Sequence, residues 1–319
     1  MIEEKEPGSS SLPRSDCGEA PMHWNDRVYG DVEIREPELL ALIACPTFQR
    51  LRQIRQAGPS AFAFPFKTVT RFEHSLGVFV LLRRLGASLR EQVAGLLHDI
   101  SHTAFSHAVD FVFASEEQDH HEQLKPLFLE RADIVAALQA LHFQPQEFFD
   151  DSVYPLLERP LPALCADRLD YFFRDSLACQ VTTPETIARF LNDLTVIDDT
   201  IAFEHAEIAR EAVTAFSVMN RDWWASSIES YIYNEFADIL REGFRLGELT
   251  KDDLLTDDNQ VMSKLQESSS PIIKTKLEHI FHFDEQRLEG FTPRVLPKTR
   301  WLDPPVRQGR SFRCLSEIL

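Results

Sequence analysis

The stretch LLHDISHTAFSH, residues 96–107, joins the end of an apolar helix to a group of histidines. An apolar helical pattern over residues 89–97 leads into it, so His98 and Asp99 come at the end of a buried helix. Asp99 has no basic neighbour in the sequence, and a carboxylate beside an apolar helix needs a partner, for which a cation is well suited. His98 and His102 are four residues apart and share one face if the helix continues. The stretch therefore indicates either a metal site or histidines that cap a helix at the surface.

Histidines gather around this stretch. Of the 11 in the chain, six lie between residues 74 and 121, namely His74, His98, His102, His107, His120 and His121. Imidazole and carboxylate groups together suit Mn, Fe, Zn, Ni or Mg, and the residue types alone do not choose between these metals. We therefore expect a divalent metal ion of open identity.

A second polar motif is ADRLDYFFRDS, residues 166–176. A helix over this motif places four polar side chains on one face, namely Asp167, Tyr171, Arg174 and Asp175. A charged face is usually solvated. A phenol and a guanidinium between carboxylates are also what a polar ligand pocket needs, and the pattern alone leaves both interpretations open.

The remaining pattern predicts a mostly α-helical protein. Residues 1–22 are polar and rich in Pro, Gly and Ser, which is typical of a flexible leader. Helices are expected over about 71–84, 89–97, 130–142 and 162–176, within a helical core over residues 23–185. Residues 186–319 are expected to form a helical extension, with a β-hairpin near 196–203 and an extended, Pro-rich tail from Thr292.

Composition narrows the function classes. The chain has 319 residues and a net charge of −18, which argues against a strong nucleic-acid-binding surface but allows a small anionic substrate beside a metal. The five cysteines are scattered and form no CxxC pair, and no apolar leader segment is visible, so we expect a cytoplasmic protein. The longest apolar runs are too short to cross a bilayer, so no membrane association is expected.

Six motifs together resemble a known family. VYGDVEI, FQRLRQIRQAG, RFEHSLGV, LLHDISHTAFSH, HHEQ and ADRLDYFFRDS occur in the order found in the HD-domain metal-dependent phosphohydrolases. The sequence is most similar to their deoxynucleoside triphosphate triphosphohydrolase branch, which includes the SAM-and-HD-domain enzymes. The resemblance covers roughly residues 25–180, and more loosely extends to about 265. It implies an HD-domain helical fold for the core over 23–185.

The resemblance also implies roles for individual residues. The metal ligands of the family match His74, His98, Asp99 and Asp167. The catalytic positions match His121, its carboxylate partner Glu122, and His102. Positions that contact the phosphate or the sugar match Gln56, Arg71, His107, Arg168, Tyr171 and Asp175.

Two departures from the triphosphohydrolase branch leave the substrate open. The usual Gly-His-Gly-Pro-Phe-Ser-His segment reads SHTAFSH at 101–107, and residues 227–236 lack the histidine that helps to enclose the base in that branch. The first hypothesis is hydrolysis of a dNTP to a deoxynucleoside and triphosphate. The alternatives are a phosphomonoesterase or phosphodiesterase on another nucleotide, and a metal-binding regulatory module without turnover. By analogy with the family, a homodimer is possible.

Overall fold

The computed structural model describes residues 21–113, 120–295 and 298–318. The expected leader therefore lies almost entirely outside the described residues, and strand β1 (Met22–Asp26) already includes residue 22. β1 pairs antiparallel with β2 (Gly30–Ile34). The carboxylate of Asp26 fixes the turn between them, because it accepts hydrogen bonds from the backbone N–H groups of Val28 and Tyr29.

The first half of the chain packs around helix α4 (Arg71–Arg84), whose first eleven residues are all buried except Val80. Thr70 caps this helix by accepting a hydrogen bond from the backbone N–H of Glu73. α4 packs against α5 (Leu89–Leu97) and α9 (Ala166–Ala178). The remaining helices of this part are α1 (Pro37–Ala44), α2 (Pro46–Gln49), α3 (Ser60–Ala63), α6 (Ala108–Phe113), α7 (His120–Leu129) and α8 (Ala132–Ala140).

Gly77 sets how closely α4 and α9 approach each other. A Cβ at this position would collide with the side chains of Asp170 and Arg174 on α9. Any other residue at position 77 would displace this buried ion pair or push α9 away. Because α9 carries Asp167, this close contact also fixes the distance between Asp167 and His74 on α4.

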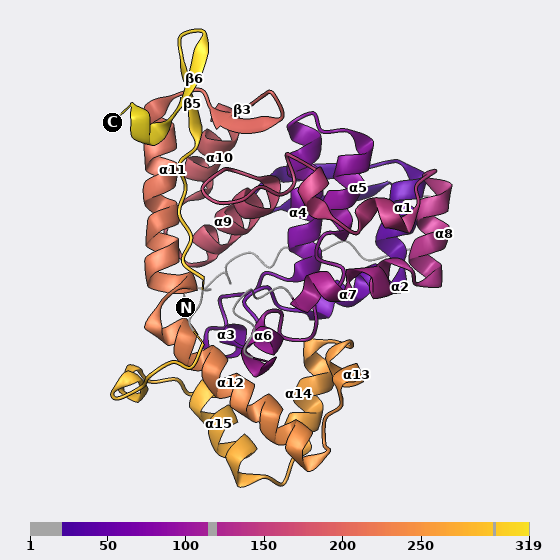
Figure 1. Cartoon of the computed structure of the whole chain (residues 1–319), viewed down its shortest axis with the longest axis vertical. Helices are drawn as coiled ribbons and strands as arrows, with labels where there is room; N and C mark the ends of the chain where they lie inside the picture. The colour runs from indigo at the N-terminus through magenta and orange to yellow at the C-terminus, as the bar shows by residue number, and fades with distance from the viewer. Residues whose placement is uncertain (1–20, 114–119, 296–297, 319) are drawn as a thin grey trace, which may run out of the picture.

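The second half of the chain adds a lobe and a small sheet (Figure 1). α10 (Pro184–Asp193) and α11 (Ala206–Met219) belong to the same apolar cluster as α4 and α9. α12 (Ser227–Leu246) packs against α6 and α15, in a second apolar cluster. The other helices here are α13 (Lys251–Leu254), α14 (Asp258–Glu267) and α15 (Pro271–Phe281).

The small sheet joins two distant segments. β3 (Leu194–Ile197) and β4 (Thr200–Phe203) form an antiparallel hairpin, as expected for residues 196–203. β5 (Pro305–Gln308) pairs parallel with β4, and β6 (Ser311–Cys314) completes the order β3-β4-β5-β6. The tail expected to be extended therefore ends in a second hairpin that is part of this sheet.

The mostly helical class is confirmed, and one helix boundary was wrong. The helix expected over 162–176 begins at Ala166, and Pro162 lies before it in a turn, after a cis peptide bond with Leu161. Among the described residues, no helix combines the length and the apolar character needed to cross a membrane.

Candidate metal centre and substrate pocket

Four expected metal ligands converge at one point. His74 lies on α4, His98 and Asp99 follow α5, and Asp167 lies in the first turn of α9. Nε2 of His74 is 2.9 Å from Oδ1 of Asp167 and 3.2 Å from Nε2 of His98. Oδ2 of Asp99 is 3.7 Å from Nε2 of His74, and Oδ1 of Asp99 is 3.5 Å from Nε2 of His98. Three helices thus bring two imidazoles and two carboxylates together.

The orientation of the two imidazole rings fits a cation. Nδ1 of His98 is 2.8 Å from the carbonyl oxygen of Gly95, which can only accept, so Nδ1 carries the hydrogen. Nδ1 of His74 is held in the same way by the carboxylate of Asp170 at 2.7 Å. The two Nε2 atoms face each other and the carboxylates, so a bound divalent metal would take the place of a proton held between them. Two imidazole nitrogens and carboxylate oxygens are a donor set that such ions prefer.

The electrostatics of this cluster favour positive charge. Burial lowers the pKa of His74, but Asp167, Asp170 and Asp99 outweigh burial and raise it to about 10. Burial raises the pKa of Asp99, but Arg71 and the neighbouring histidines hold it well below its usual value. A buried cluster that binds a proton this strongly is one that a metal ion would also stabilise.

Asp170 was not among the residues predicted from the sequence. The predicted position of its partner, Arg174, also needs a correction. Arg174 was expected to share one helix face, either solvated or lining a pocket, with Asp167, Tyr171 and Asp175, but its side chain is fully buried. Its guanidinium donates to Asp170 at 2.8 Å, to Glu73 at 2.8 Å and to Asp26 at 3.0 Å. Arg174 therefore fixes Asp170, which in turn orients the imidazole of His74.

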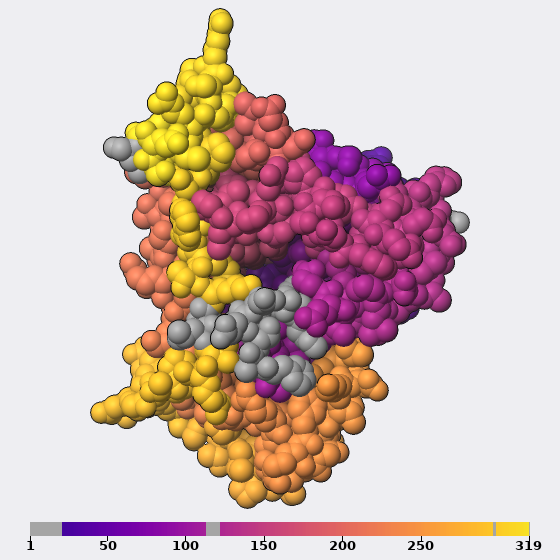
Figure 2. Space-filling view, viewed as in Figure 1, coloured from indigo at the N-terminus to yellow at the C-terminus, as the bar shows by residue number. Residues whose placement is uncertain are grey.

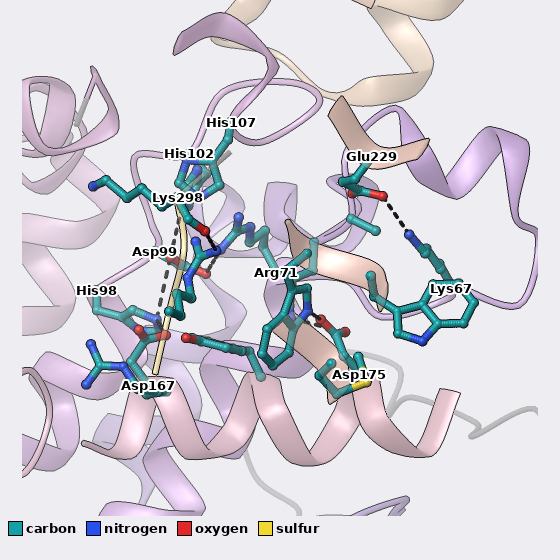
Figure 3. A pocket seen from close by; sticks show the side chains of 18 of the residues that line it. Lys67, Arg71, His98, Asp99, His102, His107, Asp167, Asp175, Glu229 and Lys298 are labelled. Carbon is teal, nitrogen blue, oxygen red and sulfur yellow. Dashed lines mark hydrogen bonds and ion pairs between the residues drawn. The ribbon is translucent and has the colours of Figure 1, made fainter. Parts of the chain in front are cut away.

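Next to the metal ligands lies a pocket of about 420 Å³, which is large enough for a nucleotide-sized ligand (Figure 3). Figure 2 shows a hollow between the magenta part of the chain and the yellow C-terminal segment. In Figure 3, His98, Asp99 and Asp167 lie at one end of the pocket, and Lys67 and Glu229 lie at the other. Of the expected site residues whose side chains the structure describes, His74 alone does not line the pocket. The others all do, namely Gln56, Arg71, His98, Asp99, His102, His107, Glu122, Asp167, Arg168, Tyr171 and Asp175.

Arg71 is held in place beside the metal ligands. Its Nη1 donates to Oδ2 of Asp99 at 2.8 Å, and its Nε donates to Oγ of Ser106 at 3.0 Å. Ser106 in turn donates to the backbone carbonyl of Arg55 at 2.7 Å. Phe105 and Ser106 have φ values of 61° and 53°, so this loop keeps a left-handed conformation without glycine. The loop that departs from the family sequence is thus the one that positions Arg71.

The two histidines of the loop lie together. Nε2 of His102 is 3.1 Å from Oδ1 of Asp99, and Nδ1 of His107 is 3.1 Å from Oδ2 of Asp110. The rings of His102 and His107 are 4.9 Å apart and nearly perpendicular. His102 is buried and the His107 side chain is 29% exposed, so His107 faces the more open part of the pocket.

Tyr171 and Asp175 continue the pocket wall along α9. The indole N–H of Trp224 donates to Asp175 at 2.9 Å, and the side-chain amide of Gln56 donates to Asp175 at 3.4 Å. The ring of Trp224 lies edge-on against Tyr171, with centroids 5.1 Å apart. Trp224 could not be predicted from the sequence, because it comes from a π-helical turn, Asn220–Trp224, with no motif of its own.

The structure supports the expected roles of Arg168 and of the His121–Glu122 pair only in part. Arg168 lines the pocket, but its Nη1 and Nη2 donate to the carbonyls of Arg159 and Ala163 and to Glu158. The side chain of His121 lies outside the described residues, so its catalytic role stays a prediction. Glu122 lines the pocket and is 3.8 Å from Nζ of the buried Lys125, which also pairs with Asp151.

Comparisons with known proteins decide the family. The HD domain model matches residues 71–175. The chain is 32% identical over 296 residues to the uncharacterized protein YdhJ of Bacillus subtilis, covering 88% of this chain and 90% of YdhJ. The chain belongs to the HD-domain family. It is also 32% identical to the metal-dependent phosphohydrolase cns2 of Cordyceps militaris, covering 88% of this chain and 84% of cns2.

The likeness to triphosphohydrolases is shorter. The chain is 29% identical over 217 residues to the deoxynucleoside triphosphate triphosphohydrolase SAMHD1 homolog of Dictyostelium discoideum, covering 58% of this chain and 41% of that protein. The chain is a member of the HD-domain family, and His74, His98 and Asp99 lie close enough together to hold a metal ion. The protein is therefore a metal-dependent phosphohydrolase that acts on phosphate esters.

Proposed function

We propose that this HD-domain enzyme hydrolyses a nucleotide, with conversion of a dNTP to a deoxynucleoside and triphosphate as the first candidate. The observation that carries the proposal is the pocket face of α9. Asp167, Tyr171 and Asp175 follow one another at four-residue spacing and all line one pocket, which runs from the metal ligands to Trp224. A phosphate beside the metal would therefore place an attached sugar beside the phenol and carboxylate, and a base near the indole.

The residues divide the chemistry among themselves. His74, His98, Asp99 and Asp167 would hold the metal. A bound divalent ion would polarise a phosphoryl oxygen and lower the pKa of a water ligand from about 15.7 towards 7. Arg71, fixed by Asp99 and Ser106, would offset negative charge that grows on the phosphate.

Different residues are proposed for proton transfer and for binding of the sugar. His121, with Glu122, is the proposed group that transfers the proton, and His102 would stand beside it at the phosphate. Tyr171 and Asp175 would bind a sugar hydroxyl, with Gln56 and Trp224 orienting the carboxylate of Asp175.

Hydrolysis of a nucleoside monophosphate is the second candidate, and the charges of the pocket favour it. Among the residues that the structure describes, seven carboxylates but five Lys or Arg side chains line the pocket. Three of these cations already pair with acids, namely Arg71 with Asp99, Lys67 with Glu229, and Arg168 with Glu158. A monophosphate needs less positive charge than a triphosphate does. The relative cns2, matched over most of both chains, is named only as a metal-dependent phosphohydrolase.

The two candidates differ in their inorganic product. Protein loaded in turn with Mn²⁺, Mg²⁺, Ni²⁺ and Fe²⁺ is incubated with dNTPs, nucleoside monophosphates, cyclic dinucleotides and p-nitrophenyl phosphate. Release of triphosphate from a dNTP supports the first candidate, and orthophosphate from a monophosphate supports the second. Metal binding without turnover of any substrate would contradict both and favour a regulatory module.

A further inference from the structure

The C-terminal segment crosses the pocket on its way to β5. We define the C-terminal strap as residues 298–304. The backbone N–H of Arg300 donates to Oδ1 of Asn220 at 2.8 Å, and the backbone N–H of Asp303 donates to the carbonyl of Pro162 at 3.0 Å. Leu302 and Pro304 are buried. The strap is therefore fixed to both walls of the pocket, to the turn before α12 on one side and to the turn before α9 on the other.

Two side chains of the strap line the pocket, and both are cations. Lys298 and Arg300 belong to its wall, and Figure 3 shows Lys298 on the side of the pocket where His98, Asp99 and His102 lie. The charge of Arg300 also reaches the phenol of Tyr171. Burial raises the pKa of Tyr171, and among the charges that oppose this rise the one on Arg300 has the largest effect. The strap thus brings positive charge to the α9 face between the metal ligands and Asp175.

These two cations differ from the other cations of the pocket in their partners. Arg71, Lys67 and Arg168 each pair with a carboxylate. Within the described ranges, neither Lys298 nor Arg300 pairs with an acidic side chain, and Nη1 of Arg300 donates only to the carbonyl of Lys298, at 3.2 Å. In a chain of net charge −18, unpaired cations beside carboxylate-rich metal ligands are well placed to bind an anion.

We propose that Lys298 and Arg300 form a phosphate-binding pair, supplied by the C-terminal strap, that holds the phosphate of the substrate against the metal centre. The proposal rests on the proposed function, and it adds the residues that supply the charge missing from the HD-domain part of the pocket. Lys298 acts as a mobile point charge, and the guanidinium of Arg300 keeps Nε and Nη2 for oxygen atoms of the phosphate.

Phosphate binding tests the pair without any turnover. Inorganic phosphate and tripolyphosphate are titrated calorimetrically into Mn²⁺-loaded protein at low ionic strength, for the wild type, Lys298→Ala, Arg300→Ala and Lys298→Arg. Each alanine variant is expected to bind phosphate roughly tenfold more weakly, because it loses a charge-assisted hydrogen bond. Lys298→Arg is expected to keep most of the affinity. Mn²⁺ affinity is expected to be the same in all four proteins.

The matched control is Arg313→Ala, which removes the same charge from an exposed position on β6 outside the pocket. It is expected to bind phosphate like the wild type. Wild-type affinity in both alanine variants, an equal loss in Arg313→Ala, or no phosphate binding by the wild type would each overturn the pair. Failure of the proposed function looks different: the wild type would bind phosphate in a Lys298-dependent manner but hydrolyse no nucleotide.

Discussion

His74 is held from both ring nitrogens, which makes it the most constrained residue of the site. Asp170 accepts from Nδ1, and Nε2 faces Asp167 and His98. Asp170 is itself fully buried and fixed by Arg174. The geometry of the metal ligands therefore depends on a carboxylate that does not reach the metal.

Asp170→Asn tests that dependence. An amide can present its NH₂ group to Nδ1 of His74, which would favour the wrong tautomer and turn a hydrogen toward the metal. Mn²⁺ affinity, measured by titration calorimetry, is expected to fall roughly 10- to 100-fold. Asp193→Asn is the control, because Asp193 also contacts Nδ1 of a histidine, His205, but lies outside the pocket. Unchanged Mn²⁺ affinity in a folded Asp170→Asn protein would refute the role of Asp170.

His121 is expected to act on the proton and not on the metal. His121→Ala should keep wild-type Mn²⁺ affinity and lose turnover by roughly 10²- to 10⁴-fold, the contribution typical of a general acid or base. His282→Ala, at an exposed position, serves as the control. Parallel loss of metal and turnover in His121→Ala would instead place His121 among the ligands.

At the residue scale, the functional residues that could be predicted from the sequence are those that lie in a family motif. His74, His98, Asp99 and Asp167 carry the family signature, and the structure brings them together. Asp170 was missed although it lies in the same motif, because its partner on α4 is 96 residues away and no local pattern marks the contact. Arg174 was misplaced for the same reason: helical spacing puts it near Tyr171, and only the packing of α4 on α9 shows that it is buried.

At the scale of elements, the start of α14 supports the loop at residues 101–107. The buried carboxylate of Asp258 accepts from the backbone N–H of Phe105 at 2.6 Å and from that of Arg55 at 2.9 Å. These are the segments that Ser106 joins to Arg71. An element about 150 residues downstream therefore holds the loop in its left-handed conformation.

Asp258 also predicts a pH dependence. Burial raises its pKa to about 7, against the two backbone donors that lower it. Above about pH 4 the unfolded chain loses the proton of Asp258, whereas the folded protein keeps it until about pH 7. The contribution of Asp258 to the free energy of unfolding is therefore complete below about pH 4 and is lost as the pH rises to about 7. Compared with Asp258→Asn, the unfolding free energy of the wild type should fall across this window by up to about 4 kcal/mol.

Urea unfolding of both proteins from pH 4 to pH 8 gives this difference directly. Groups that titrate identically in the two proteins cancel. If the unfolding free energy of the wild type instead rises with pH relative to that of Asp258→Asn, the two N–H donors keep Asp258 ionised and burial does not dominate.

At the scale of the whole molecule, the pocket is built from distant parts of the chain. α4, α5 and α9 supply the metal end, while the turn before α12 and the C-terminal strap supply Trp224, Lys298 and Arg300. The hairpin near 196–203 and the long helices were predictable because each follows a local period. The positions of Trp224, Lys298 and Arg300 in the pocket were not predictable, because these residues lie outside every motif and meet the pocket only through tertiary packing.

Trp224→Ala separates the two parts of the pocket. KM for a nucleotide is expected to rise roughly tenfold, because the variant loses an aromatic surface and the donor that orients Asp175. Hydrolysis of p-nitrophenyl phosphate, which lacks sugar and base, should be nearly unaffected. Ile272→Ala, at a position 49% exposed on α15 and outside the pocket, is the control. Equal losses on both substrates would contradict a nucleoside-binding role for this wall.

The centre formed by His74, His98, Asp99 and Asp167 is expected to hydrolyse phosphate esters only with a bound divalent metal. The most direct measurement is the rate of product release from the substrate panel by chelator-treated protein, before and after Mn²⁺ is added back, with Asp167→Ala measured alongside. We predict no release after chelation, recovery on addition of Mn²⁺, and neither metal binding nor release in Asp167→Ala. Full release in the presence of chelator, or from Asp167→Ala, would contradict the claim.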